Sequence, residues 1–348
     1  MFFLRFALLL FAAACTWGAG LVEFGKEELD RAIAGRKLPP SRFRLQTEIN
    51  QLGAESFQIA GVRVSGGDLR GLMYGLLEAA SQIRAAGRLA AVRGSPVAAV
   101  RGLRVAIEDG DLAGDGGALR AYWAELLDEM ARTRLNRLKL ALSERVILGE
   151  RQWRSLQAIS EAAMNRAIEL ALVLSPVNLP EAALNVGPRI GALAAARSVE
   201  IGGGPETAGR AALVRAVAEP GRRIVLELPY PLASPGLIAE VVDAGLPWRV
   251  VAPAELRAGG QEFSGAGGVV WFFVAPRTGS DARLDAAFIN SSLKSMEAAG
   301  AAGFEIELPP PSEGKSWASL CRAWGERSYR VTSTAPPKPA ARPAPKKK

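Results

Sequence analysis

The chain of 348 residues contains no histidine at all. This absence excludes every Ser-His-Asp and Cys-His catalytic site and every metal site that depends on imidazole ligands. Only two cysteines are present, Cys15 and Cys321. If the N-terminal segment is removed after Gly20, Cys321 is alone and no intramolecular disulfide can form. Any chemistry must therefore rely on carboxylates, Lys, Arg, Tyr, Ser or Cys321, and the sequence predicts neither a metal nor a cofactor.

Long apolar runs are also missing. The longest covers Phe6–Ala14, after a short start with one positive charge at Arg5, and it is too short for a membrane span of about 20 residues. Small residues follow as far as Gly20, which is the pattern of a cleaved secretory signal. We therefore expect an exported protein, periplasmic or secreted, with residues 1–20 as signal peptide and no transmembrane segment. The alternative is a degenerate lipoprotein signal in which Cys15 is acylated.

The net charge of +8 is concentrated at the C-terminus. Residues 332–348 carry five basic residues and no acid among prolines and alanines, which predicts a disordered tail. This basic tail is either a soluble extension or a contact to an anionic envelope surface. The remaining chain is nearly neutral and has no basic cluster, so a nucleic-acid partner is not expected.

Hydrophobic periodicity divides the chain into two parts. Residues 21–95 predict a small α/β domain with a helix over Lys26–Ala34 and strands over Phe43–Ile49, Ser56–Ala60 and Val62–Ser65. A helix capped by Asp68 should run to Ala86 and end at Gly87, with Leu69, Leu72, Met73, Leu76, Leu77, Ala80 and Ile83 on its apolar face.

Residues 96–331 alternate between strand and helix patterns. The predicted strands are Gly102–Ile107, Arg137–Leu142, Ile168–Leu174, Ser198–Ile201, Arg223–Leu228, Trp248–Ala252, Val269–Val274 and Phe304–Leu308. The predicted helices are Leu119–Thr133, Arg151–Ala167, Leu184–Ala196, Thr207–Ala218, Pro235–Ala244 and Ala282–Ala299. Eight such strands in about 230 residues favour a compact (β/α)8 TIM barrel. A doubly wound open sheet is the alternative, but no Gly-rich dinucleotide turn follows the first strand.

Two segments carry a resemblance. Residues 55–78, with Gly66-Gly67-Asp68 at their centre, resemble the non-catalytic domain that precedes the barrel in glycoside hydrolases of the beta-hexosaminidase and alpha-glucuronidase type. Residues 101–104 and 126–138 are similar to the start of the catalytic barrel in these families. The resemblance implies a carbohydrate partner and the hydrolysis of glycosidic bonds. The adjacent Asp-Glu pair expected after the fourth barrel strand is absent, because Glu200-Ile201-Gly202-Gly203-Gly204 stands there.

The alternation of residues along the strands indicates which charged side chains face the barrel interior, where a catalytic or binding site could form. In Phe304–Leu308 the apolar residues share one face and the glutamates the other, and the same division recurs in six other strands. Since the apolar face of a barrel strand meets the helices, the charged face should point inward. The predicted interior residues are Arg104, Lys139, Glu169, Glu200, Glu227, Arg249, Glu305 and Glu307.

Two interpretations of this interior remain open. In one, Glu227 and Glu307 are the acid and the nucleophile or base of a glycosidase, and Arg104, Lys139, Glu200, Arg249, Glu305 and Trp271 contact the sugar. In the other, the charges are a salt-bridge network, and the protein is a catalytically inactive glycan-binding or structural cell-envelope protein. The sequence leaves open whether the chain is an enzyme.

Overall fold

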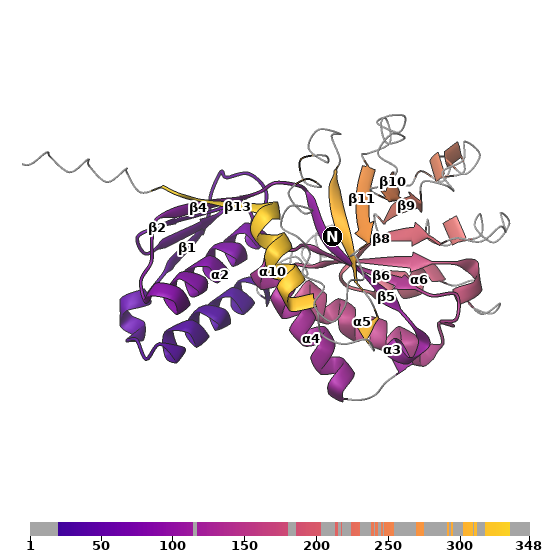
Figure 1. Cartoon of the computed structure of the whole chain (residues 1–348), viewed down its shortest axis with the longest axis horizontal. Helices are drawn as coiled ribbons and strands as arrows, with labels where there is room; N and C mark the ends of the chain where they lie inside the picture. Colours follow the sequence, from indigo (N-terminus) through magenta and orange to yellow (C-terminus); the bar gives the residue numbers. More distant parts are fainter. Residues whose placement is uncertain are drawn as a thin grey trace, which may run out of the picture. The chain divides into compact units, whose positions relative to one another are not determined.

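A computed structural model describes two compact units. The described residues are 20–113, 117–179, 186–202, 224–229, 247–253, 269–274, 302–308 and 317–334, with a few isolated positions between them. Within these, one unit holds residues 25–95 and 330–334, and the other holds residues 20–24 and 96–329. Figure 1 labels the elements of both units.

The smaller unit contains a five-stranded sheet in the order β1-β3-β2-β4-β13. Its strands are β1 (Gln46–Ile49), β2 (Phe57–Ala60), β3 (Arg63–Gly66), β4 (Val92–Pro96) and β13 (Tyr329–Ser333). β3 runs parallel to β1 and antiparallel to β2. β1 begins three residues after the start of the predicted strand Phe43–Ile49, because Pro40–Phe43 forms a short 3-10 helix, η1.

The sequence interpretation missed β4 and β13. It also placed residues 332 and 333 in a disordered tail, whereas they belong to β13 and extend the small sheet. The remainder of the predicted tail, residues 335–348, lies outside the described residues.

Helix α2 (Leu69–Ala86) lies against the small sheet, and its limits follow from its sequence. The Asp68 carboxylate accepts a hydrogen bond from the Gly71 backbone N–H, and Gly87 ends the helix in the left-handed conformation at φ 66°. Six of the seven predicted apolar residues are buried, but Leu69 is 40 % exposed. Leu69 is the first residue of the helix, so its side chain lies beyond the part of the face that the sheet covers.

The larger unit contains eight parallel strands in the order β10-β11-β12-β5-β6-β7-β8-β9, with β9 also paired to β10, which is the strand order of a TIM-like fold. The strands are β5 (Val100–Ile107), β6 (Arg137–Leu142), β7 (Glu169–Leu174), β8 (Ala196–Ile201), β9 (Val225–Pro229), β10 (Trp248–Pro253), β11 (Val269–Val274) and β12 (Gly303–Leu308). All eight coincide with the predicted strands to within two residues at each end.

The described helices of this unit are α3 (Asp109–Ala113), α4 (Gly117–Arg132), α5 (Glu150–Met164), α6 (Val186–Ala192) and α10 (Trp317–Ser328), with a short 3-10 helix η2 (Pro176–Asn178). The predicted helix over Leu184–Ala196 is shorter than expected, because β8 already begins at Ala196. The predicted helices over Thr207–Ala218, Pro235–Ala244 and Ala282–Ala299 lie almost entirely outside the described residues.

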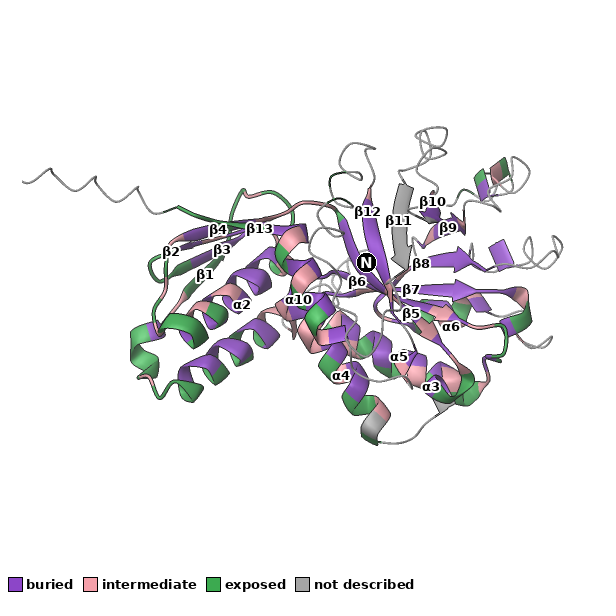
Figure 2. Cartoon of the chain, viewed as in Figure 1, coloured by how far each residue is buried: buried purple, intermediate pink, exposed green. Residues whose placement is uncertain are grey.

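The core of the larger unit lies between strands and helices. Leu103, Val105 and Ile107 of β5 are fully buried, and the Phe304 ring packs edge-on against Trp324 of α10 with ring centroids 4.0 Å apart. Figure 2 shows β6, β7 and β8 as buried along their length, while α4 and α5 alternate buried and exposed residues. Cys321 is buried in this core, and burial raises the pKa of its thiol.

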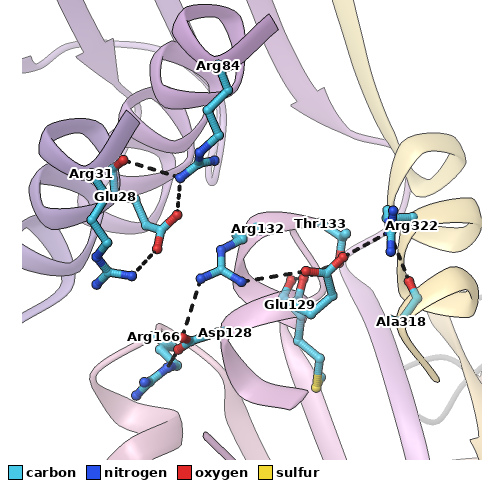
Figure 3. A network of polar contacts seen from close by, with 11 residues as sticks. Glu28, Arg31, Arg84, Asp128, Glu129, Arg132, Thr133, Arg166, Ala318 and Arg322 are labelled. Carbon is cyan, nitrogen blue, oxygen red and sulfur yellow. Dashed lines mark hydrogen bonds and ion pairs between the residues drawn. The ribbon is translucent and has the colours of Figure 1, made fainter. Parts of the chain in front are cut away.

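Each unit also contains ion pairs between side chains of its helices. In the smaller unit, the buried Glu28 carboxylate pairs with Arg31 at 2.5 Å and with Arg84 (Figure 3). In the larger unit, Glu129 of α4 pairs with Arg322 of α10 at 3.2 Å, which links two helices. The Glu129–Arg322 pair is partly exposed and contributes little to stability, whereas the buried Glu28 carboxylate depends on its two arginines.

Candidate functional site

The inward face of the larger sheet brings together charges from six strands. Each charged residue alternates with apolar neighbours along its strand, so the apolar set packs under the helices and the charged set faces the barrel axis. The described members are the cations Arg104, Arg137, Lys139 and Arg249 and the carboxylates Glu200, Glu227, Glu305 and Glu307. We call these eight residues the barrel charge network.

Lys139 of β6 is at the centre of the network. Its ammonium Nζ lies 2.7 Å from Glu200 Oε2, 2.7 Å from Glu227 Oε2 and 2.8 Å from Glu305 Oε2. The side chain is fully buried. Burial alone would lower the pKa of Lys139, but the three carboxylates outweigh it and raise the pKa. The ammonium therefore stays charged and holds three strands together from inside.

Arg137 is a second buried cation on the same strand. Its guanidinium Nε lies 2.6 Å from Glu305 Oε1, and its Nη2 pairs with Glu227 and donates to Ser198 Oγ at 2.9 Å. Burial would lower the pKa of Arg137, but the charges of Glu227 and Glu305 outweigh this effect, and the pKa is raised. Sequence analysis did not name this residue, although the two-residue spacing from Lys139 puts both on one face of β6.

Arg104 connects the buried centre to a more open edge. Its Nη1 lies 2.8 Å from Glu200 Oε2, and its Nε lies 3.5 Å from Glu307 Oε2. Burial would raise the pKa of Glu200, but Lys139 and Arg104 lower it to about 2. The Arg104 side chain is 13 % exposed and that of Glu307 33 %, which makes Glu307 the most accessible carboxylate of the network.

Glu227 of β9 contacts three cations. Besides Arg137 and Lys139, it pairs with Arg249 of β10, whose Nε and Nη2 lie 2.6 Å and 2.5 Å from Oε1. Both of its carboxylate oxygens are thus engaged, and its side chain has no exposed surface. Four cations face four carboxylates in the network, so the charges balance. This balance offsets much of the cost of removing eight charges from water.

The remaining predicted site residues lie apart from this centre. Glu169 begins β7, half-buried, beside Arg137 in the strand register, and its charge contributes to the raised pKa of Arg137. The side chain of Trp271 lies outside the described residues, as do Gly203 and Gly204 after β8. In the described part of the chain, no group of three or more acidic or cysteine residues is placed to hold a metal ion.

Comparisons with known proteins identify the scaffold. No family model matches the chain, and no curated protein matches it by sequence. Among solved structures, a GH138 enzyme targeting pectin rhamnogalacturonan II is similar with a TM-score of 0.63 and 14 % identity, over 89 % of this chain and 62 % of that one. A Flavobacterium johnsoniae chitobiase of family GH20 has a TM-score of 0.57 and 12 % identity, over 90 % and 64 %.

The fold of this chain is therefore glycoside-hydrolase-like, in agreement with the resemblance found in the sequence. The chain spans less than two thirds of the length of either neighbour. In the part of the chain that the structure describes, no helix is both long and apolar enough to cross a membrane.

Proposed function

We propose that this chain is a glycoside-hydrolase-like protein that binds carbohydrate without cleaving it. In this proposal a small domain precedes a compact (β/α)8 barrel whose interior charges have a structural role. The observation that carries the proposal is the environment of Glu227, which is fully buried and paired with Arg137, Lys139 and Arg249. A carboxylate so enclosed can neither reach a glycosidic oxygen nor attack an anomeric carbon.

The other carboxylates of the barrel charge network do not replace it. Glycosidases of the usual type need two carboxyl groups flanking the scissile bond, one of which carries a proton for the leaving group. Glu200 has a pKa of about 2 and is ionised at neutral pH, and Glu305 is fully buried between Arg137 and Lys139. Of the four described carboxylates of the network, Glu307 alone retains substantial exposure. The absence of an Asp-Glu pair after β8, where Gly202-Gly203-Gly204 follows, also supports this proposal.

Binding is proposed at the carboxyl ends of the barrel strands, where sites form in this type of fold. Glu307 is the fifth of the six residues of β12, Arg104 of β5 lies beside it in the strand register, and both side chains keep part of their surface exposed. Their oxygens and N–H groups suit the hydroxyls of a sugar, which both donate and accept hydrogen bonds. One neighbour targets pectin rhamnogalacturonan II and the other is a chitobiase, so pectic and chito-oligosaccharides are the first candidates.

Calorimetric titration with pectic and chito-oligosaccharides tests this binding. We expect saturable binding by the wild-type chain that weakens about tenfold or more in Glu307→Gln and Arg104→Gln. The matched control is Arg63→Gln, in the smaller unit, which should bind as wild type. If no member of the panel binds, or if the two variants bind as tightly as wild type, the proposed site is wrong.

We further propose export, on the basis of the charged start, the apolar run Phe6–Ala14 and the small residues before Gly20. Cell fractionation with mass spectrometry of the mature N-terminus tests it. A chain beginning at Leu21 supports a secretory signal, an acylated Cys15 supports a lipid anchor, and an intact Met1 in the cytoplasm contradicts export.

A further inference from the structure

A cavity lies on the outer helical layer, and no residue of the barrel charge network lines it. It has a volume of about 330 Å³ and is formed by α4 and α5, which pack against each other. That volume is at the lower end of the range for small-molecule sites, about 300–1,000 Å³. The cavity therefore suits a small ligand better than the broad surface of a folded partner.

The charge around the cavity has one sign. Arg120 of α4 and Arg151 and Arg154 of α5 line it, and none of its ten lining residues is acidic. Glu150, next to Arg151 in the chain, does not line the cavity; it pairs with Arg189 and also feels the charge of Arg154. Three arginines among the residues that line one cavity favour an anion, and the planar fork of Arg suits a carboxylate best.

The rest of the lining is mostly apolar. Leu119, Trp123 and Ile159 contribute to it, together with three alanines of the two helices. Ser155, which also lines the cavity, already donates its hydroxyl to the Leu112 carbonyl at 2.8 Å. A ligand that fits both parts has an anionic head for the arginines and a hydrocarbon tail for the apolar side chains.

A sugar acid fits less well than such an amphiphile. Sugar rings stack on the open face of an aromatic ring, and the single aromatic residue among the lining residues, Trp123, is only 4 % exposed. Its ring is already packed edge-on against Tyr122, with centroids 5.2 Å apart. The cavity thus offers apolar edges and small alanine surfaces, which match methylene groups.

From these observations we propose that the cavity between α4 and α5 binds the carboxylate and proximal chain of a fatty-acid anion. The arginines hold the head group at the rim, and the chain lies along Trp123 and Ile159. The inference is independent of the proposed carbohydrate site, since no residue of the barrel charge network lines the cavity.

Titration of the full chain with dodecanoate below its micelle concentration, followed by calorimetry, tests the proposal. Wild type should bind one equivalent saturably. Arg120→Gln/Arg154→Gln, which changes two exposed side chains, should weaken binding about tenfold or more, and Ala158→Trp should block it by filling the cavity. Arg63→Gln is the matched control and should bind as wild type.

Three further ligands separate the contributions of head and tail. Decanol should bind far more weakly than decanoate because it lacks the anionic head, and glucuronate should not bind. The proposal is overturned if dodecanoate shows no saturable binding, if the double arginine variant binds as tightly as wild type, or if glucuronate binds as well as dodecanoate. Circular dichroism of each variant confirms that it is folded.

Discussion

At the scale of single residues, Lys139 is the group on which the barrel interior depends most directly. It is fully buried and lies within 2.8 Å of three carboxylates that come from β8, β9 and β12. Strand alternation predicted the inward direction of Lys139, Glu200, Glu227 and Glu305. It could not predict which charges pair, because the pairing depends on the relative heights of strands that are far apart in the sequence.

Replacing Lys139 with methionine should lower the free energy of unfolding by about 3–5 kcal/mol, because three buried carboxylates lose their shared cation. Urea denaturation measures this change. Adding Glu200→Gln should recover part of the loss, since it removes one of the uncompensated charges. Lys26→Met, at an exposed position, is the control and should change stability by less than about 0.5 kcal/mol. A loss below about 1 kcal/mol in Lys139→Met would contradict a structural role for the network.

The pKa of Glu200 predicts an acid-dependent contribution to stability. Its folded-state pKa of about 2 lies below the ordinary value of 4.5, so ionised Glu200 stabilises the fold above pH 4.5. That contribution, about 3 kcal/mol, is lost as the pH falls from 4.5 to 2. Urea unfolding at several pH values should show the stability difference between wild type and Glu200→Gln shrinking over this window. A difference that stays constant from pH 7 to pH 2 would exclude the depressed pKa.

At the scale of elements, the sequence predicted the eight barrel strands and helix α2 closely. Their signals are local, because alternation, the Asp68 cap and the Gly87 terminus are all contained in the elements themselves. β4 and β13 were missed because neither carries a clear strand pattern in its own residues. β4 contains a glycine and ends in proline, and β13 is mostly exposed and joins a sheet whose other strands lie more than 200 residues earlier.

Two glycines provide a test of helix packing. A Cβ at Gly71 in α2 would lie 2.3 Å from the Ser56 carbonyl oxygen, whereas a Cβ at Gly35, the last residue of the described helix over residues 20–35, would have no atom within 4 Å. Helix propensity alone favours alanine at both positions. We expect Gly71→Ala to destabilise the chain by about 1–3 kcal/mol and Gly35→Ala to be neutral or stabilising by up to about 1 kcal/mol. Thermal unfolding of both variants measures the difference, and equal effects would show that α2 can move away from the loop at Ser56.

At the scale of the whole molecule, the fold could be predicted further than the function. Eight strand patterns and the residues around Gly66-Gly67-Asp68 were enough to indicate a glycoside-hydrolase-like scaffold, which the structural neighbours support. The function depends on which charges remain accessible, and no local pattern contains that information. Glu227 and Glu307 have the same alternating context in the sequence, yet one is fully buried and the other is 33 % exposed.

The central claim is that the barrel charge network supports the fold and does not cleave glycosidic bonds. The most direct test is hydrolysis of a panel of aryl glycosides, including hexosaminides and glucuronides, by the wild-type chain, Glu227→Gln and Glu307→Gln. We predict no turnover above the buffer blank for any of the three proteins, with wild type folded by circular dichroism. Turnover by wild type that is abolished in both variants would contradict the claim and identify Glu227 and Glu307 as a catalytic pair.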